Sequence, residues 1–376
     1  MAWIEGHGAG WRVRYYRPDG TIGSETGYTN PDQARDRAAD IEYETRQGTF
    51  NDPRKAQTTF GEWTEIWCDA HDVAEGTWAK YNSHLRNHIR PKFADTPLEE
   101  ITHIKIKQWV KGLRRHLGDA TVADIVTLLS MILGEAVEED YIGKNPCRRL
   151  KLNLDPSTPK ETASPSVVRR IADRCDPAYG TLIITAAYTG MRWGELAGLQ
   201  WHNVNLGGNA LITVDPDKGA LHEIGGRLEL GPPKTPASAR PIHLPKFLVQ
   251  LLTEHAARQH HDHVFTGPRD GLLRRANFRD RIWRPAVAGN KKRGWAPIQA
   301  GLTFHGLRHT HKTWLNEDHA DKALQHQRIG HRMPGVEGIY SHVTQPMIDH
   351  MLTALDTRWR RSHHGHGDTD ATGDKR

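Results

Sequence analysis

Apolar and polar residues alternate through residues 3–26, on either side of a Pro-Asp-Gly turn at residues 18–20. Alternation with a period of two predicts β-strands, and a turn between two such runs predicts a hairpin. A helical pattern follows, with Asn30 expected to cap the helix and Pro31 in its first turn, where the missing N–H costs nothing. Residues 1–50 are therefore expected to form a small β-sheet with one helix.

A longer helical region follows the polar linker at residues 51–55. Its first helix is expected to bury one apolar face, made by Phe60, Trp63, Ile66 and Trp67. Further amphipathic runs cover residues 77–89, 102–116 and 120–138. Residues 57–150 are therefore expected to be an all-α domain.

Residues 158–361 mix helical and strand-like patterns and are expected to form a further domain. Turn residues separate three strand-like runs, which predict one small antiparallel sheet from residues 210–214, 227–230 and 240–244. The last helical run carries an apolar stripe from Met347 to Trp359, which would pack either on its own domain or on a neighbouring subunit. The His-rich tail, residues 362–376, is poor in apolar residues and is expected to be disordered. The predicted fold class is mainly α with small antiparallel β-sheets (α+β), in several domains.

Composition adds few constraints. A chain of 376 residues is long enough for several domains, and 51 Lys and Arg against 45 Asp and Glu give a net charge of +6, which is compatible with a polyanionic partner. The cysteines Cys68, Cys147 and Cys175 are far apart, which argues against a disulfide framework and favours a reducing cytoplasm. Neither an export signal nor a run of about 20 apolar residues stands out, so no membrane partner is expected.

The third predicted domain repeats arginine and histidine in short polar windows, which suits the binding of a phosphate. An exchange at a phosphodiester needs a nucleophile, stabilisation of charge on the non-bridging oxygens, and an acid for the departing alkoxide. The residues that could supply these functions are Arg192, Lys234, His305, Arg308, His331 and Tyr340.

The non-bridging oxygens would be held by four of these side chains. Arg192, on a turn that opens a helix, and Arg308 would present planar guanidinium groups, a geometry that a lysine does not reproduce. His305 and His331 would donate further hydrogen bonds to the same oxygens as negative charge develops.

The remaining two side chains would carry out the exchange itself. Tyr340 would attack the phosphorus in line and become covalently joined to it, while Lys234, expected at the tip of a hairpin, would protonate the leaving oxygen. Tyr188 is a rival tyrosine, but its apolar neighbours predict a core position. No phosphate-binding loop of the G-x-x-x-x-G-K-[ST] type occurs, and neither a nucleotide cofactor nor a metal ion is expected.

The order of these residues resembles that of the tyrosine recombinases of the phage-integrase family. Residues 189–196, Thr-Gly-Met-Arg-Trp-Gly-Glu-Leu, resemble the family's first arginine box, and residues 305–310, His-Gly-Leu-Arg-His-Thr, resemble its H-x-x-R-H box. Lys234 corresponds to the family's hairpin lysine, and His331 and Tyr340 correspond to its second histidine and its nucleophile. Glu195 matches an acidic residue that buttresses the family's site, which implies that it orients a neighbouring catalytic group.

The resemblance implies a site-specific DNA recombinase that breaks and rejoins strands through a 3′-phosphotyrosyl intermediate. It implies an arm-type DNA-binding module in residues 1–50, a core-type DNA-binding domain in residues 57–150 and a catalytic domain in residues 158–361. The implied partners are double-stranded DNA, further copies of the chain in a homotetramer, and a DNA-bending accessory protein or a directionality factor. The helix that carries Met347 and Trp359 would be exchanged or docked between subunits.

Alternatives remain open at this point. A type IB topoisomerase would use the same chemistry to relax DNA as a monomer, and a non-catalytic protein would use the three modules for DNA binding alone. The N-terminal module is either a capping module or a β-ribbon that enters a DNA groove, and the basic residues of the helical domain are either a solvated face or a DNA-binding surface. Pro334 and Gly335 would make the segment before Tyr340 a turn that assembly could switch.

Overall fold

The computed structural model describes residues 1–17, 20–47, 50, 55, 57–152, 161–333 and 342–364. The chain divides into two compact units, Met1–Ser157 and Thr158–Arg376. Two separate hydrophobic clusters lie in the first unit, one in an N-terminal sheet module and one in a helical bundle. A larger cluster forms the core of the second unit. The predicted fold class, mainly helical with small antiparallel sheets, is confirmed.

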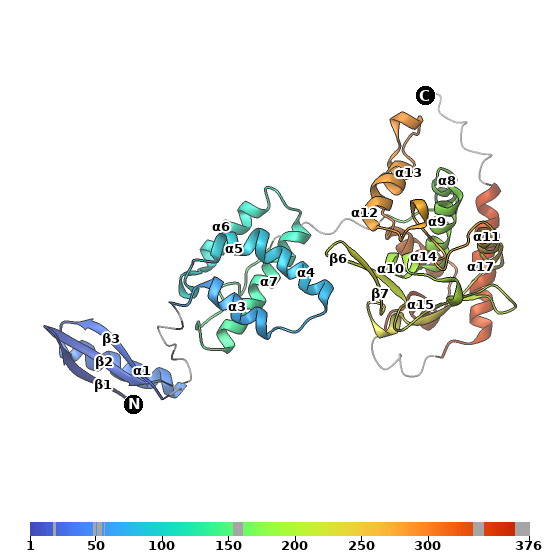
Figure 1. The fold of residues 1–376 in the computed structure, drawn as a ribbon. Coiled ribbons are helices and arrows are strands. Elements are labelled where there is room, and N and C mark those ends of the chain that lie inside the picture. Colours follow the sequence, from blue (N-terminus) through green and yellow to red (C-terminus); the bar gives the residue numbers. More distant parts are fainter. Residues whose placement is uncertain are drawn as a thin grey trace, which may run out of the picture. The chain divides into compact units, whose positions relative to one another are not determined.

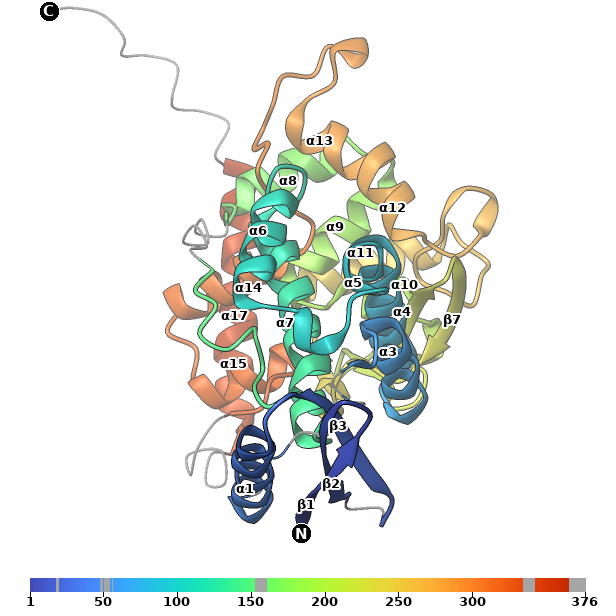
Figure 2. The same cartoon turned by 90° about the vertical axis from the view of Figure 1, so that its left-hand side faces the viewer.

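The N-terminal module is a three-stranded antiparallel sheet with α1 against one face (Figure 2). Its elements are β1 (Ala2–His7), β2 (Gly10–Tyr16), β3 (Ile22–Tyr28) and α1 (Pro31–Gln47). Strands β2 and β3 form the expected hairpin, and β1 pairs with the other edge of β2. Asn30 caps α1 as predicted, because its Oδ1 accepts a hydrogen bond of 2.8 Å from the backbone N–H of Asp32. The core consists of Val13, Tyr15, Ala34, Ala38 and Ile41.

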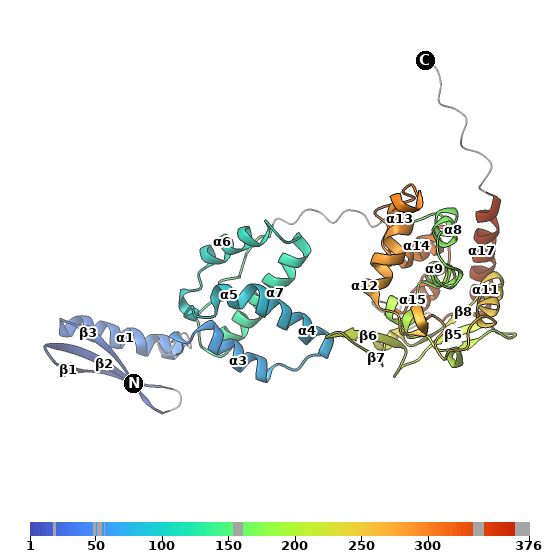
Figure 3. The same ribbon diagram turned by 45° about the horizontal axis from the view of Figure 1, so that its top comes forward.

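The helical bundle is all-α and is organised around α7, which contacts α3, α4 and α6 (Figure 3). Its helices are α3 (Phe60–Ala70), α4 (Glu75–His84), α5 (Arg90–Phe93), α6 (His103–Leu113) and α7 (Asp119–Glu138), with a π-helical turn, Leu85–Ile89, joining α4 to α5. Thr59 and Glu62 form a capping box at the start of α3. The predicted buried face of this helix is confirmed for Phe60, Trp63 and Trp67, but it is wrong for Ile66, which is 49% exposed.

The expectation that no segment is long and apolar enough to span a membrane does not hold for α7. By length and composition alone it is apolar enough to do so. Its residues Val122, Ile125, Leu129 and Ile132 are fully buried in the core of the bundle. The apolar side of α7 that packs against α3, α4 and α6 accounts for the buried part of this composition.

The second unit is built around its helix α9, which contacts α8, α11 and α14 (Figure 1). Its helices are α8 (Pro165–Asp173), α9 (Pro177–Thr189), α10 (Trp193–Ala197), α11 (Lys246–Ala256), α12 (Arg275–Phe278), α13 (Arg284–Ala288), α14 (Gly306–Glu317), α15 (Lys322–Ile329) and α17 (Gln345–His364). A π-helical turn, Arg279–Trp283, joins α12 to α13. The sequence pattern had not indicated α12 and α13.

The strands of the second unit form two sheets, where one was expected. They are β4 (Val204–Asn205), β5 (Leu211–Val214), β6 (Ala220–Ile224), β7 (Arg227–Gly231) and β8 (Arg240–His243). One sheet has the order β4-β5-β8, and the other is the antiparallel pair β6-β7. The run at residues 227–230 therefore pairs with β6, and Lys234 lies in the connection from β7 to β8. The prediction that Lys234 sits at a hairpin tip is wrong, because the strands on either side of it, β7 and β8, belong to different sheets and do not pair.

The apolar stripe of α17 packs on its own domain, the first of the two expected arrangements. Met351 and Leu355 are buried in the main cluster, and the ring of Trp359 stacks on Phe247 of α11 at a centroid distance of 4.5 Å. Asp356 accepts hydrogen bonds from the first backbone N–H groups of α11. The helix extends to His364, so the predicted domain end at residue 361 and the start of the tail at residue 362 are both too early by three residues.

Candidate active site

Two glycines end the helices that lead into the site. Gly190 follows α9 and Gly330 follows α15, with φ angles of +66° and +63°. Glycine adopts this left-handed conformation without the steric cost that other residues incur. A Cβ would also be crowded at both positions, since it would lie 2.8 Å from the His311 ring at residue 190 and 2.8 Å from Arg240 Nη1 at residue 330.

Three successive backbone carbonyls at the end of α15 each accept a hydrogen bond from a different arginine. The bonds run from Arg240 Nε to Arg328 O (2.7 Å), from Arg308 Nη2 to Ile329 O, and from Arg192 Nη2 to Gly330 O (3.2 Å). The last carbonyls of a helix have no intrahelical partners and carry partial negative charge, so they suit cationic donors. Guanidinium groups from the N-cap of α10, from β8 and from α14 therefore converge on one helix end.

A single buried carboxylate, Glu195, holds two of these arginines. Its side chain accepts from Arg192 Nη1 at 2.8 Å and from Arg240 Nη2 at 3.0 Å, and the residue is 2% exposed. Burial alone would raise the pKa of Glu195, but the charge and hydrogen bonds of Arg240, followed by the hydrogen bonds of Arg192, hold it below its ordinary value. Glu195 is therefore ionised. It fixes the guanidinium of Arg192, and the hydroxyl of Ser238 helps by accepting a hydrogen bond from Arg192 Nη1 at 2.7 Å.

Arg308 lies in the first turn of α14 and is 6% exposed. Its Nη1 donates to the carbonyl of Gly190 at 2.6 Å, and its Nη2 also donates to His331 Nε2 at 3.1 Å. Burial, and next the positive charge of Arg192, lower the pKa of Arg308 to about 9, so the group stays cationic at neutral pH. Within the described part of the chain no carboxylate hydrogen-bonds to Arg308, so its charge remains available to an anion.

His331 is exposed at the pocket and is neutral near pH 7. Partial desolvation, followed by the positive charges of Arg308 and Arg192, lowers its pKa to about 4. Because a guanidinium can only donate, Nε2 of His331 is the acceptor, and the ring proton is on Nδ1. The prediction that His331 donates to a phosphate therefore applies to Nδ1 and not to Nε2 in this state.

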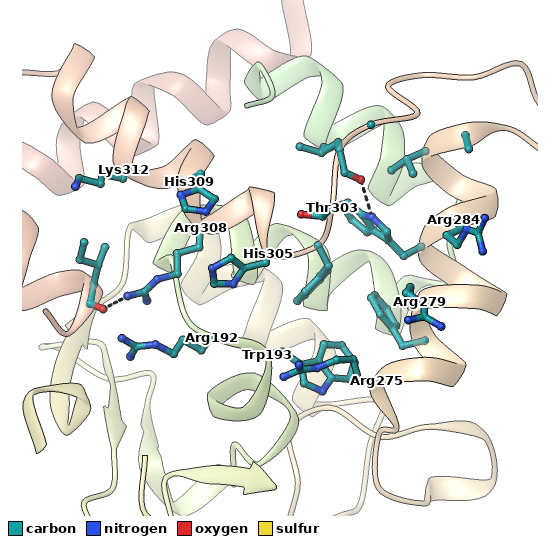
Figure 4. Close-up of a pocket in the computed structure, with 18 of the residues that line it drawn as sticks. Arg192, Trp193, Arg275, Arg279, Arg284, Thr303, His305, Arg308, His309 and Lys312 are labelled. Carbon is teal, nitrogen blue, oxygen red and sulfur yellow. Dashed lines mark hydrogen bonds between the residues drawn. The ribbon is translucent and has the colours of Figure 1, made fainter. Parts of the chain in front are cut away.

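A pocket of about 970 Å³ brings together five of the six predicted residues, Arg192, Lys234, His305, Arg308 and His331. His305 is exposed and immediately precedes α14, and Lys234 is exposed in the connection from β7 to β8. Figure 4 shows Arg192, His305 and Arg308 pointing into the same space. The sixth predicted residue, Tyr340, lies outside the described residues, as does the Pro334–Gly335 segment.

The opposite wall of the pocket was not predicted. It carries Arg275, Arg279 and Arg284 from α12, the π-helical turn and α13 (Figure 4). Between the two walls lies an aromatic group, Trp193, Phe278, Trp283 and Phe304, whose rings contact one another at centroid distances of 4.9 to 5.4 Å. The arginines at positions 275 and 279 have the i, i+4 spacing of one helical face, which was the available sequence signal.

A second buried arginine, Arg328, links the elements that present the site. Arg328 is 3% exposed and donates to His311 Nε2 at 3.0 Å and to the carbonyls of His243 and Tyr188 at 2.8 and 2.9 Å. The Tyr188 side chain is fully buried, and burial raises its pKa, so the prediction that it is a core residue is confirmed. Helix α15 is thereby tied to α9, α14 and β8, the elements that present the site.

Comparison with known proteins identifies two family segments. Residues 59–114 match the phage integrase N-terminal SAM-like domain, and residues 163–346 match the phage integrase family. A putative prophage phiRv2 integrase of Mycobacterium tuberculosis is 27% identical over 350 residues, which cover 89% of each chain.

Solved structures with the same fold include two DNA complexes. The Tn1549 transposon integrase, bound to transposon right end DNA, matches 80% of this chain and 100% of its own with a TM-score of 0.63 at 18% identity. A lambda integrase tetramer bound to a Holliday junction matches 88% of this chain and 95% of its own with a TM-score of 0.55 at 18% identity.

Proposed function

This chain belongs to the phage integrase family and is a site-specific DNA recombinase of the tyrosine type, and we propose that the pocket between α10, α14 and α15 is where it cuts and rejoins DNA strands. The observation that carries this proposal is the convergence of four side chains on one pocket: Arg192 meets His305, Arg308 and His331, which lie more than a hundred positions further along the chain. The reaction proceeds through a 3′-phosphotyrosyl intermediate, with Tyr340 as the proposed nucleophile.

The charge balance of the pocket suits a phosphodiester. Glu195 compensates part of the charge of Arg192 and Arg240, while Arg308 is hydrogen-bonded only to carbonyls and to a neutral imidazole among its described partners. An incoming phosphate would find two planar guanidinium groups already fixed in position. The N-terminus of α14, where His305 and Arg308 lie, adds its partial positive charge.

Strand cleavage in this site exchanges one phosphodiester for another. The phenol of Tyr340 loses its proton to water as its oxygen bonds to phosphorus, and the bond to the 5′ oxygen breaks. Lys234, exposed at the pocket, would give a proton to that oxygen. Because the bond energy is retained in the phosphotyrosyl link, rejoining is the same step in reverse, and no nucleotide cofactor has to drive it.

The partners proposed for this chain follow from the family and from the relatives. Double-stranded DNA is the substrate, and a homotetramer on DNA is supported by the lambda integrase tetramer bound to a Holliday junction. A DNA-bending accessory protein or a directionality factor would act with it. The three free cysteines agree with the reducing cytoplasm, which we propose as its compartment, in association with the nucleoid when bound to DNA.

The N-terminal module is proposed to bind a separate, arm-type DNA site through the open face of its sheet. Alternation along β2 directs Val13 and Tyr15 towards α1, so Arg12, Arg14 and Tyr16 lie on the opposite face. Arg12 and Arg14 share Glu5, and Arg14 lies over the ring of Trp3 at 5.8 Å. This face combines cationic and aromatic side chains, as expected for contact with a DNA groove. The other two modules would bind the core site.

Arm binding is tested in the full chain by footprinting on DNA that flanks its gene. Arg12→Ala with Arg14→Ala should remove protection at distal sites and leave protection at the core site. Arg35→Ala, on the solvent side of α1 with its side chain 64% exposed, is the matched control and should leave both. If the double variant still protected both the distal sites and the core site, the arm-binding role would be rejected.

Covalent trapping tests the central proposal. A nicked duplex that carries the recombination site loses its short 5′ fragment after cleavage, so the phosphotyrosyl adduct accumulates and survives denaturing electrophoresis. Wild-type protein should form the adduct and Tyr340→Phe should not. An adduct of unchanged yield with Tyr340→Phe would show that another residue is the nucleophile. Relaxation of plasmids without a recombination site would indicate a topoisomerase.

A further inference from the structure

We propose that Arg240 is a positioning residue for strand cleavage, which aligns the phosphate-binding groups of the pocket without touching the phosphate. This inference rests on the proposed function of the pocket. Arg240 begins β8 and is 5% exposed, and it is not among the described side chains that line the pocket. It therefore has to act through the groups to which it donates.

Those groups lie on both sides of the site. Towards α10, Arg240 donates from Nη2 and Nη1 to the two carboxylate oxygens of Glu195, at 3.0 and 3.3 Å. The Glu195 carboxylate in turn accepts from Arg192, from its Nη1 at 2.8 Å and from its backbone N–H at 3.0 Å. The orientation of the Arg192 guanidinium thus depends on a carboxylate that Arg240 fixes.

Towards α15, Arg240 donates from Nε to the carbonyl of Arg328 at 2.7 Å. The next two carbonyls, of Ile329 and Gly330, accept from Arg308 and Arg192. His331, which follows directly, accepts from Arg308. The Arg240 guanidinium therefore fixes the position of the end of α15. Arg192 and Arg308 donate to that helix end, and His331 directly follows it.

The geometry requires an arginine at this position. Its three nitrogens donate in different directions within one plane, to a carboxylate and to backbone carbonyls, including that of Ser238. A lysine has one nitrogen and would satisfy either Glu195 or the α15 carbonyl. Without Arg240, the buried Glu195 would have Arg192 as its remaining described ion-pair partner and would draw that guanidinium away from the pocket.

The test compares single-turnover cleavage by wild type, Arg240→Met and Arg240→Lys at saturating DNA. A misalignment of about 1 Å in a phosphate-binding group costs about 100-fold in rate, so Arg240→Met should cleave about 100-fold more slowly, with nearly unchanged DNA affinity. Arg240→Lys should retain part of the rate. Arg358→Met is the matched control, because Arg358 likewise holds a carboxylate, that of Asp318, and lines no described part of the pocket.

A neutral substrate distinguishes positioning from a general structural role. Replacing one non-bridging oxygen of the scissile phosphate by a methyl group removes the charge that Arg192 and Arg308 would stabilise. If Arg240 acts by aligning them, the loss caused by Arg240→Met should be at least ten times smaller on this methylphosphonate than on phosphate. Equal losses on the two substrates, or a wild-type rate in both Arg240 variants, would overturn the inference.

Two further outcomes keep the test interpretable. If wild-type protein forms no adduct with nicked DNA, the proposed function fails, and the positioning role of Arg240 is rejected with it; a normal wild-type adduct with unaffected Arg240 variants rejects the positioning role alone. If Arg240→Met does not fold, as judged by circular dichroism and thermal unfolding, the comparison rests on Arg240→Lys. The positioning role would likewise be rejected if Arg240→Lys cleaved at the wild-type rate and its rate relative to wild type were the same on the phosphate and on the methylphosphonate.

Discussion

Arg308 donates from Nη2 to Nε2 of His331 across 3.1 Å, and this bond fixes the protonation state of the histidine before any DNA is bound. The guanidinium has no acceptor atom, so the imidazole must be the acceptor. Positive charge on His331 would oppose both Arg308 and Arg192, and the ring therefore stays neutral until an anion enters the pocket. The two groups expected to bind the same phosphate are thus bonded to each other in the free protein.

The first prediction concerns the titration of His331. In the free protein its pKa should be near 4, well below the ordinary value of 6.5, and a bound phosphodiester should raise it by adding negative charge. Arg308→Met removes the positive charge that is the second cause of the lowered pKa. The pKa of His331 should then rise only part of the way to 6.5, since partial desolvation, the first cause, remains. Histidine resonances followed by NMR between pH 3.5 and 8 measure this, with His331→Gln to assign the signal. A pKa near 6.5 in free wild-type protein would contradict the geometry.

The second prediction separates steric crowding from backbone strain. Gly330 and Gly226 both have a positive φ, but a Cβ at residue 226 would meet nothing within 4 Å, whereas at residue 330 it would lie 2.9 Å from the Ser238 Cα. Gly226→Ala should lower the free energy of unfolding by about 1–2 kcal/mol, the cost of the left-handed conformation. Gly330→Ala should lower it by roughly 2–5 kcal/mol, because overpacking adds to that cost.

Urea denaturation of the two glycine variants gives these free energies, and the trapping assay gives their activities. Gly330→Ala should also cleave more slowly, since the carbonyls that hold Arg192 and Arg308 would shift, while Gly226→Ala should cleave at the wild-type rate. Similar losses in the two variants would mean that the α15 end tolerates displacement.

The sequence predicted the site more completely than it predicted the strands around it. Arg192 and His305 lie in short windows whose residue types suggest phosphate chemistry, and helical periodicity located α9, α14 and α15. The β6-β7 hairpin was missed because β6 alternates weakly, and pairing between strands is a long-range property that local patterns do not contain. Arg240 and Ser238 were missed for a related reason: their importance comes from contacts with residues 45 to 88 positions away, and nothing in their local sequence marks those contacts.

The third prediction concerns the basic wall of the pocket. If Arg275 contacts a DNA phosphate next to the scissile one, Arg275→Ala should weaken binding to all sequences alike and reduce the slope of log affinity against log salt by about 1. Arg281→Ala is the matched control, because Arg281 lies on the same helical segment and is exposed but lines no described part of the pocket. Fluorescence anisotropy at several salt concentrations measures both slopes. Equal slopes in the two variants would exclude Arg275 from the DNA contact.

The last prediction concerns Lys234 as the acid for the leaving group. Lys234→Ala should slow cleavage of an ordinary phosphodiester by about 10²–10⁴-fold, the usual contribution of a general acid. A substrate with sulfur in place of the bridging 5′ oxygen releases a thiolate, which needs no proton because thiols are far more acidic than alcohols. On this substrate the variant should recover most of the wild-type rate. Lys312→Ala, another lysine of the same pocket, should show no such recovery, since it would act on binding alone. Equal slowing of Lys234→Ala on oxygen and sulfur substrates would remove Lys234 from the acid role and leave it a contact to DNA.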